Sequence, residues 1–154
     1  MLAELIMVGM LLSPTPEVEC LAKNMYYEAR SEGIAGMLAV TNVVINRVED
    51  ERFPGTICEV IKQGPTIELG TDVKFPVKNR CQFSWYCDGK SDEPIDLEMY
   101  AATRGLAHQV LRKAFPYLDL TGGALFYHAE YIKPKWSSKF QLTLILNKHM
   151  FYKW

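Results

Sequence analysis

Residues 24–33 read NMYYEARSEG and place a carboxylate, Glu28, where the apolar face of a helix is expected. Leu21, Met25 and Glu28 fall at positions i, i+4 and i+7, which is the spacing of a single helical face. A carboxylate on that face is partly desolvated, which is costly unless it stays protonated or finds a partner. Enzymes use such a desolvated carboxylic acid to protonate a leaving group near neutral pH. Glu28 is therefore a candidate catalytic acid.

The structural alternative is an ion pair between Glu28 and a neighbouring cation, Arg30 or Lys23. Structural ion pairs greatly outnumber catalytic acids, so helical spacing alone favours the pair. The choice between the two depends on the rest of the chain.

Length and composition predict one globular domain. The chain has 154 residues, of which 49% are hydrophobic and 23% are charged, as in ordinary soluble domains. Its net charge of −1, with no basic tract, argues against a general nucleic-acid-binding role. We expect an N-terminal arm at 1–16 and a folded domain at 17–154. The arm is apolar, too short to span a bilayer and not preceded by Lys or Arg; a weak uncleaved export signal is the alternative.

The residue pattern changes from helical to strand-like along the chain, which predicts an α+β fold with a small antiparallel sheet after the helices. Residues 64–80 contain two prolines and two glycines and are expected to form a long loop. Helical patterns occupy 17–31, 37–50, 56–64 (with Thr56 as N-cap) and 95–114. Short β-rich runs occupy 81–87, 122–129 and the two halves of 139–154, with a turn near Asn147.

The four cysteines leave the redox state open, because no pair has the two-residue spacing of a zinc or thioredoxin-type site. Cys81 and Cys87 flank five residues and are a possible disulfide if the protein works outside the cytosol. In that case we expect Cys20 to be buried and free, with Cys58 as a competing partner. Buried free thiols are the alternative.

Eight ordered blocks of sequence carry a resemblance to a known family. At YYEARSEG (26–33) and AVTNVVINRV (39–48), the chain resembles the SleB-type cell-wall hydrolases, the spore cortex-lytic enzyme family. The resemblance continues in the family's order and covers roughly residues 20–153. Its further blocks are FPGTICEVI, CQFSW, CDG, TGGALFYHA, Trp136 and HMFY.

The resemblance implies a lysozyme-like or lytic-transglycosylase-like fold that cleaves the glycan strand of peptidoglycan, between N-acetylmuramic acid and N-acetylglucosamine. The glutamate of the EAR block maps onto Glu28 as the catalytic acid, and no metal or nucleotide cofactor is implied. Two positions depart from the family pattern. Tyr27 replaces a glycine before the acid, and Leu146-Asn147-Lys148 replaces a glycine-containing turn, which asparagine can tolerate.

A second carboxylate would indicate which reaction the enzyme performs, because glycoside hydrolysis usually needs two. The candidates also fit turns or helix ends: Asp88, Asp92, Glu32 and Asp119. A site with one glutamate favours a lytic transglycosylase that leaves 1,6-anhydro ends. A muramidase that uses water is the alternative.

We expect the sugar to contact polar and aromatic side chains near Glu28. The predicted substrate-binding residues are Tyr27, Gln82, Ser84, Trp85 and Tyr127. In a strand, Phe83 and Trp85 would share one face while Gln82 and Ser84 share the other, so one aromatic residue can belong to the core. Tyr127 and His128 alternate, so at most one is expected to face the sugar. His149 is read as a hydrogen-bonded structural residue.

Two rival functions stay open. A cysteine amidase or peptidase would pair Cys81 or Cys87 with His128 or His149. A non-catalytic glycan-binding virion protein is the other. The expected partner is peptidoglycan, with no nucleic acid and no stable membrane insertion, and the protein is expected to be a monomer or a component of a phage particle. It would act on the bacterial wall, in the periplasm or outside the cell, and its compact size suits a phage-encoded enzyme.

Overall fold

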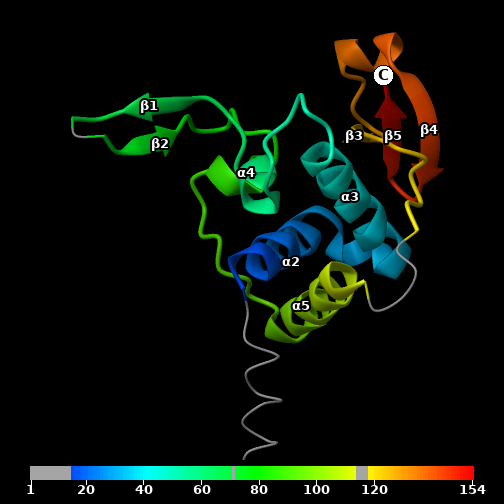
Figure 1. Cartoon of the computed structure of the whole chain (residues 1–154), viewed down its shortest axis with the longest axis horizontal. Coiled ribbons are helices and arrows are strands. Elements are labelled where there is room, and N and C mark those ends of the chain that lie inside the picture. The colour runs from blue at the N-terminus through cyan, green and yellow to red at the C-terminus, as the bar shows by residue number, and fades with distance from the viewer. Residues whose placement is uncertain (1–14, 71, 114–117) are drawn as a thin grey trace, which may run out of the picture.

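The computed structural model describes residues 15–70, 72–113 and 118–154, so all but the last two residues of the predicted arm at 1–16 lie outside the described residues. Helices fill one part of the molecule, and a three-stranded sheet stands beside them (Figure 1). This mixed α+β architecture confirms the predicted fold class.

Helix α2 (Pro16–Ala29) carries Glu28 and lies among the other helices (Figure 1). Its first turn is built by local rules: the Thr15 side chain accepts a hydrogen bond from the amide of Val18, and Pro16 is the first helical residue. The helix gives way at Arg30–Glu32 to a 3₁₀ turn, so Glu28 lies in its last turn. The predicted helix at 17–31 is therefore confirmed, with a slightly earlier end.

Helix α3 (Gly33–Val48) begins four residues before the predicted segment at 37–50 and is buried on most sides, as its apolar sequence indicated. The short helix α4 (Ile57–Ile61) has Thr56 as its N-cap, as predicted. Helix α5 (Leu97–Arg112) is capped by Asp96 and packs against α2. A hydrogen bond of 3.0 Å from the amide of Asp96 to the Tyr26 hydroxyl joins the start of α5 to α2.

The main sheet is antiparallel, with the order β3 (Phe126–Ala129), β5 (His149–Lys153), β4 (Gln141–Leu146). The predicted β4–β5 turn is confirmed, and Asn147 adopts a left-handed backbone there, with φ of 51°. Side-chain bonds join the sheet to α3, because Asn46 donates to the carbonyl of Ala124 just before β3.

Two sequence expectations are wrong. The loop expected at 64–80 contains a hairpin of β1 (Thr66–Glu68) and β2 (Lys74–Pro76), in which Ile67 pairs with Phe75. The strand expected at 81–87 is instead a 3₁₀ helix at Ser84–Cys87. A seven-residue strand would separate its ends by about 20 Å. The Cys81–Cys87 disulfide holds the two Cα atoms 6.0 Å apart, which excludes an extended segment.

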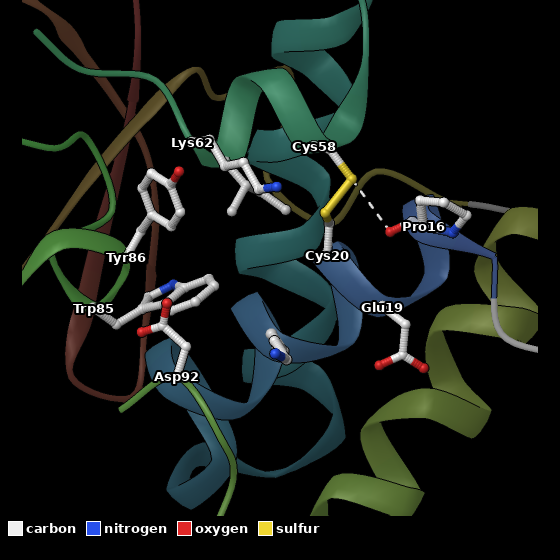
Figure 2. Close-up of a pocket in the computed structure, with 10 residues that line it drawn as sticks. Pro16, Glu19, Cys20, Cys58, Lys62, Trp85, Tyr86 and Asp92 are labelled. Carbon is white, nitrogen blue, oxygen red and sulfur yellow. Dashed lines mark hydrogen bonds between the residues drawn. A yellow bond between two sulfur atoms is a disulfide. The ribbon is translucent and has the colours of Figure 1, made fainter. Parts of the chain in front are cut away.

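All four cysteines form disulfides, Cys20–Cys58 and Cys81–Cys87. The expectation that Cys20 is free is therefore wrong. Cys20 lies on α2 and Cys58 on α4, and their bond ties these two helices together beside a cavity of about 390 Å³ (Figure 2). The pairing places the second turn of α2 against α4 and fixes the helix that carries Glu28.

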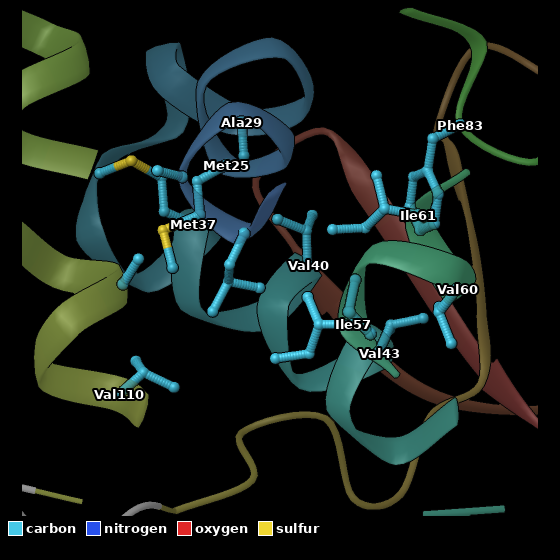
Figure 3. Packing of buried hydrophobic residues seen from close by; sticks show 14 of the residues in the cluster. Met25, Ala29, Met37, Val40, Val43, Ile57, Val60, Ile61, Phe83 and Val110 are labelled. Atoms are coloured by element: carbon cyan, nitrogen blue, oxygen red, sulfur yellow. The ribbon is translucent and has the colours of Figure 1, made fainter. Parts of the chain in front are cut away.

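The hydrophobic core lies where α2, α3 and α4 meet (Figure 3). Leu21 and Met25, from the face that leads to Glu28, are fully buried. Full burial of one such side chain stabilises the fold by about 1.5–3 kcal/mol. Phe83 and Phe151 extend the core towards the sheet, so Glu28 lies where the packed helices meet the strands. Among the described residues, no helix has the length and apolar character needed to cross a bilayer.

Candidate active site

Glu28 is partly buried, and its carboxylate is held by the sheet. The Tyr127 hydroxyl, on β3, donates a hydrogen bond of 2.7 Å to Oε2 of Glu28. The expected structural pairs do not form in the described part of the chain. Arg30 donates instead to the carbonyl of Tyr26, at 3.1 Å, and Lys23 pairs with Glu93, at 3.5 Å. The ion-pair interpretation of Glu28 is therefore wrong.

The surroundings of Glu28 favour its protonated form. Burial raises the pKa of the Glu28 carboxyl, while the hydrogen bond from Tyr127 and the charge of His149 act to lower it. The balance is a raised pKa. The Tyr127 hydroxyl stays protonated, because burial and the neighbouring Glu28 charge hold the pKa of the phenol well above its usual value. Tyr127 is therefore a donor throughout the neutral pH range.

A cavity of about 440 Å³ opens over Glu28. Three predicted substrate-binding residues, Gln82, Ser84 and Tyr127, line it. The side chains of Gln82 and Ser84 are exposed while Phe83 and Trp85 are buried, so burial alternates although the segment is not a strand. The remaining lining residues are Arg47, Phe83, His128, Ala129, Tyr131, Ile132, Pro134, Trp136 and His149.

The other two predicted residues, Tyr27 and Trp85, line a neighbouring cavity of about 650 Å³. Their rings stack on each other, with centroids 5.0 Å apart and planes at 17°. The Trp85 indole donates a hydrogen bond of 3.0 Å to Asn24 on α2. Trp85 therefore has a structural role as well as a place in a cavity wall.

Tyr127 and His128 on β3 both line the Glu28 cavity. That at most one of them faces the sugar stays a prediction. Tyr127 points its hydroxyl at Glu28, and His128 bonds to the Tyr152 hydroxyl at 2.9 Å. The β3 strand is short and lies at the edge of the sheet, so residues of both its faces reach the cavity.

The four candidates for a second carboxylate lie elsewhere. Asp119 accepts hydrogen bonds from Asn46, Thr121 and Gly123, which fixes the loop before β3. Asp88 lines the Tyr27–Trp85 cavity, and Asp92 lines the cavity beside the Cys20–Cys58 disulfide. Among the described residues that line the Glu28 cavity, Glu28 is the only carboxylate.

The fourth candidate, Glu32, holds a cavity residue in place. Its Oε2 lies 2.5 Å from Nδ1 of His149, whose ring meets that of Tyr127 edge to face, with centroids 5.2 Å apart. The interpretation of His149 as a hydrogen-bonded residue is confirmed. Sequence analysis did not find that this histidine also lines the Glu28 cavity, because its partner lies 117 residues away.

Sequence analysis also missed Arg47 and did not assign Trp136 to the site. Arg47 lies in the last turn of an apolar helix, where a cation is expected to complement the helix dipole. Its side chain instead is buried and reaches the wall of the Glu28 cavity. The only signal for this placement is that the rest of the helix is too apolar to be exposed.

Two other chemistries find no support. With all four cysteines in disulfides, no thiol is available to act as the nucleophile of a cysteine amidase or peptidase. Among the described residues, no cluster of His, Cys, Asp or Glu has the arrangement of a metal site.

Comparisons with known proteins identify relatives of the whole fold. A model of the cell wall hydrolase family matches residues 31–152, a range that begins just after Glu28. The catalytic domain of the germination-specific lytic transglycosylase SleB from Bacillus anthracis is 25% identical, with a TM-score of 0.62 over 92% of this chain and 98% of that one. The catalytic domain of the Bacillus cereus SleB protein is also 25% identical, with a TM-score of 0.60 over 89% of each chain. No curated protein matches the sequence.

Proposed function

Because the chain belongs to the cell wall hydrolase family, we propose that it is a lytic transglycosylase with Glu28 as its catalytic residue. The enzyme acts on peptidoglycan, and the proposed bond is the one between N-acetylmuramic acid and N-acetylglucosamine. One observation carries the proposal: Glu28, with its raised pKa, is the only carboxylate among the described residues that line its cavity.

In the first step, Glu28 donates its proton to the glycosidic oxygen. The bond from that oxygen to C1 of the muramoyl residue breaks, and the oxygen leaves as the 4-hydroxyl of N-acetylglucosamine. The raised pKa keeps a larger fraction of Glu28 protonated than an exposed glutamate would have, which suits a general acid.

In the second step, the Glu28 carboxylate accepts the proton of the muramoyl C6 hydroxyl. The C6 oxygen attacks C1 and closes a 1,6-anhydro ring, so no water is consumed. Intramolecular attack has a high effective concentration, which lets it compete with water. Tyr127 donates to the carboxylate formed in the first step and stabilises it between the two steps.

The walls on either side of Glu28 suit a glycan. Gln82 and Ser84 offer hydrogen-bonding groups to the N-acetyl and hydroxyl groups of a sugar. Tyr27 and Trp85, in the neighbouring cavity, offer aromatic surface. Tyr27 stands directly before the acid, where the family has glycine, and its ring is stacked on Trp85 in the neighbouring cavity.

Hydrolysis is the second candidate, and His149 favours it. His149 lines the same cavity as Glu28 and is held through Nδ1 by Glu32. In its neutral form, its second ring nitrogen is the candidate acceptor of a proton from water. If the enzyme is a muramidase, the base to test is therefore His149, rather than Asp88, Asp92 or Asp119.

Digestion of purified peptidoglycan in water enriched in heavy oxygen separates the two reactions. A transglycosylase leaves 1,6-anhydro ends without the label, whereas a hydrolase leaves reducing ends that carry it. We expect unlabelled anhydro ends by mass spectrometry, and none with Glu28→Gln. Products with only labelled reducing ends would establish the hydrolytic alternative.

We place the site of action at the bacterial cell wall, in the periplasm or outside the cell. The two disulfides agree with an oxidising compartment. A phage origin and a monomeric state stay predictions.

A further inference from the structure

Arg47 is a buried cation that is fixed in place from one side. Its side chain is 2% exposed, and its Nε donates a hydrogen bond of 2.7 Å to the carbonyl of Leu125, just before β3. The guanidinium carbon lies 5.1 Å from the ring centre of Phe53 and 5.6 Å from those of Phe83 and Phe126. A backbone carbonyl and three aromatic rings therefore hold the planar group.

One nitrogen of the guanidinium lacks a hydrogen-bond partner. Its Nη1 is buried without a hydrogen bond to any described residue. Burial lowers the pKa of Arg47 to about 10, so the group is still charged at neutral pH. A buried N–H donor without an acceptor is costly, and such a group calls for an explanation beyond packing. A ligand oxygen would supply the missing acceptor.

Arg47 also lies where a ligand can reach it. It lines the Glu28 cavity and a second cavity of about 310 Å³, and Gln82, Tyr127 and Trp136 line both. Tyr127 links the cation to the acid, because its hydroxyl bonds to Glu28 while the charge of Arg47 acts on its phenol. Arg47 is thus one side chain away from the proposed catalytic carboxyl.

We infer that Arg47 binds the lactyl group of N-acetylmuramic acid, through its carbonyl or carboxylate oxygen. This inference rests on the proposed function. Both sugars of the strand carry an acetamido group, but only muramic acid carries an acyl oxygen on its C3 substituent. That substituent is on the same ring as the C1 atom that Glu28 acts on, so a neighbouring side chain can reach it.

The chemistry of the two groups matches. A guanidinium presents paired N–H donors, which suit the oxygens of an acyl group, and it binds a carboxylate more strongly than a neutral carbonyl. The lactyl group is an amide where a peptide stem is attached and a carboxylate where the stem has been removed. Arg47 would therefore distinguish peptidoglycan from chitin, whose sugars have no lactyl group.

Binding to the Glu28→Gln variant of the full chain tests this without cleavage. Isothermal titration calorimetry would use three soluble glycans of equal length: stem-bearing peptidoglycan fragments, fragments stripped of stems by an amidase, and chitin oligosaccharides. We expect an added Arg47→Lys change to weaken both lactyl-bearing ligands by about tenfold or more, and chitin by no more than about twofold. If the stripped fragments bind more tightly, Arg47 prefers the lactyl carboxylate. If the stem-bearing fragments bind more tightly, it prefers the lactyl amide.

Arg104→Lys is the matched control, because Arg104 is a partly exposed arginine that pairs with Glu19 on the far side of α2. It should change none of the three affinities. Circular dichroism and thermal unfolding check each variant. If Arg47→Lys does not fold, the comparison of ligands in Glu28→Gln alone still decides: a lactyl preference below about tenfold contradicts the inference.

If Arg47→Lys weakens chitin binding as much as lactyl-glycan binding, Arg47 contacts the acetamido group and the lactyl assignment is wrong. The lactyl assignment is also wrong if Arg47→Lys changes the affinity of no ligand. The proposed function fails separately. If the wild-type enzyme forms no 1,6-anhydro products but binding still shows an Arg47-dependent preference for lactyl-bearing glycans, transglycosylation is rejected and the Arg47 site is kept. Anhydro products without that preference would reject only the site.

Discussion

The hydroxyl of Tyr127 lies 2.7 Å from Oε2 of Glu28, although 99 residues separate the two in the sequence. A helix end and a sheet strand thus meet at one carboxyl group. The bond explains how this carboxyl can be partly buried without a salt bridge, because the charge that forms when the proton leaves already has a donor.

Glu28→Gln should abolish most of the activity and keep the fold. Glutamine retains the shape and the hydrogen bond but has no transferable proton, so we expect a loss of at least about a hundredfold in kcat. Release of dye-labelled peptidoglycan fragments measures it. Glu68→Gln is the control, because Glu68 is an exposed glutamate on β1 paired with Lys74. A folded Glu28→Gln enzyme with near-normal rates would reject Glu28 as the acid.

Tyr127→Phe should shift the pH profile to higher pH. The hydrogen bond from Tyr127 lowers the pKa of Glu28, so its loss raises that pKa further. The acid must be protonated in the free enzyme, and kcat/KM falls as pH rises through its pKa. The decline of kcat/KM at high pH should therefore shift to higher pH in Tyr127→Phe. At the same time kcat should fall, because the carboxylate loses its hydrogen-bond donor. A decline that stays in place would show that another group sets it.

Stability should depend on pH through Glu28, with a defined sign. Its pKa is raised above the ordinary value of 4.5, so the folded state binds more protons than the unfolded state between that value and the raised one. Stability that depends on the bound proton is present below pH 4.5 and is lost as pH rises through the folded pKa. Urea unfolding across this interval should show a decline in wild type that is absent in Glu28→Gln. Parallel curves would contradict the raised pKa.

The two disulfides should contribute differently. In the chain-entropy model, a bridge across 38 residues stabilises by about 4 kcal/mol and one across 6 residues by about 2 kcal/mol. Removing Cys20–Cys58 with a double serine variant should mainly lower the free energy of unfolding. Removing Cys81–Cys87 should mainly lower activity, because this bridge shapes the segment that presents Gln82 and Ser84.

Thiol titration of the denatured, unreduced protein checks the pairing behind that prediction. We expect no free thiol in protein recovered from its working compartment. Free thiols in the Cys81→Ser/Cys87→Ser variant would show that Cys20 and Cys58 are not joined.

Local patterns predicted the helices and the place of Glu28 on a helical face, because a helical face and a cap depend on residues close in sequence. The catalytic role of Glu28 came from the family resemblance and stays a prediction. Thr56 as an N-cap and Asn147 in its turn are of this kind. The pairing of Cys20 with Cys58 was not predictable, since four cysteines allow three connectivities. The β1–β2 hairpin was missed because each strand has only three residues, and Pro65 and Pro76 indicated a loop. Arg47 was missed because burial of a helix end depends on the sheet that covers it.

The order of the sheet has a consequence for the newly made protein. Among the described strands, β5 is the last in chain order but the central one of its sheet, and β3 pairs with it along Phe126–Ala129. Synthesis on the ribosome delivers the helices well before β5. Until that strand emerges, Tyr127 has no sheet to hold it and Glu28 has no donor. We expect the proposed Glu28 site to stay incomplete in the nascent chain, because its hydrogen-bond donor is fixed in place last.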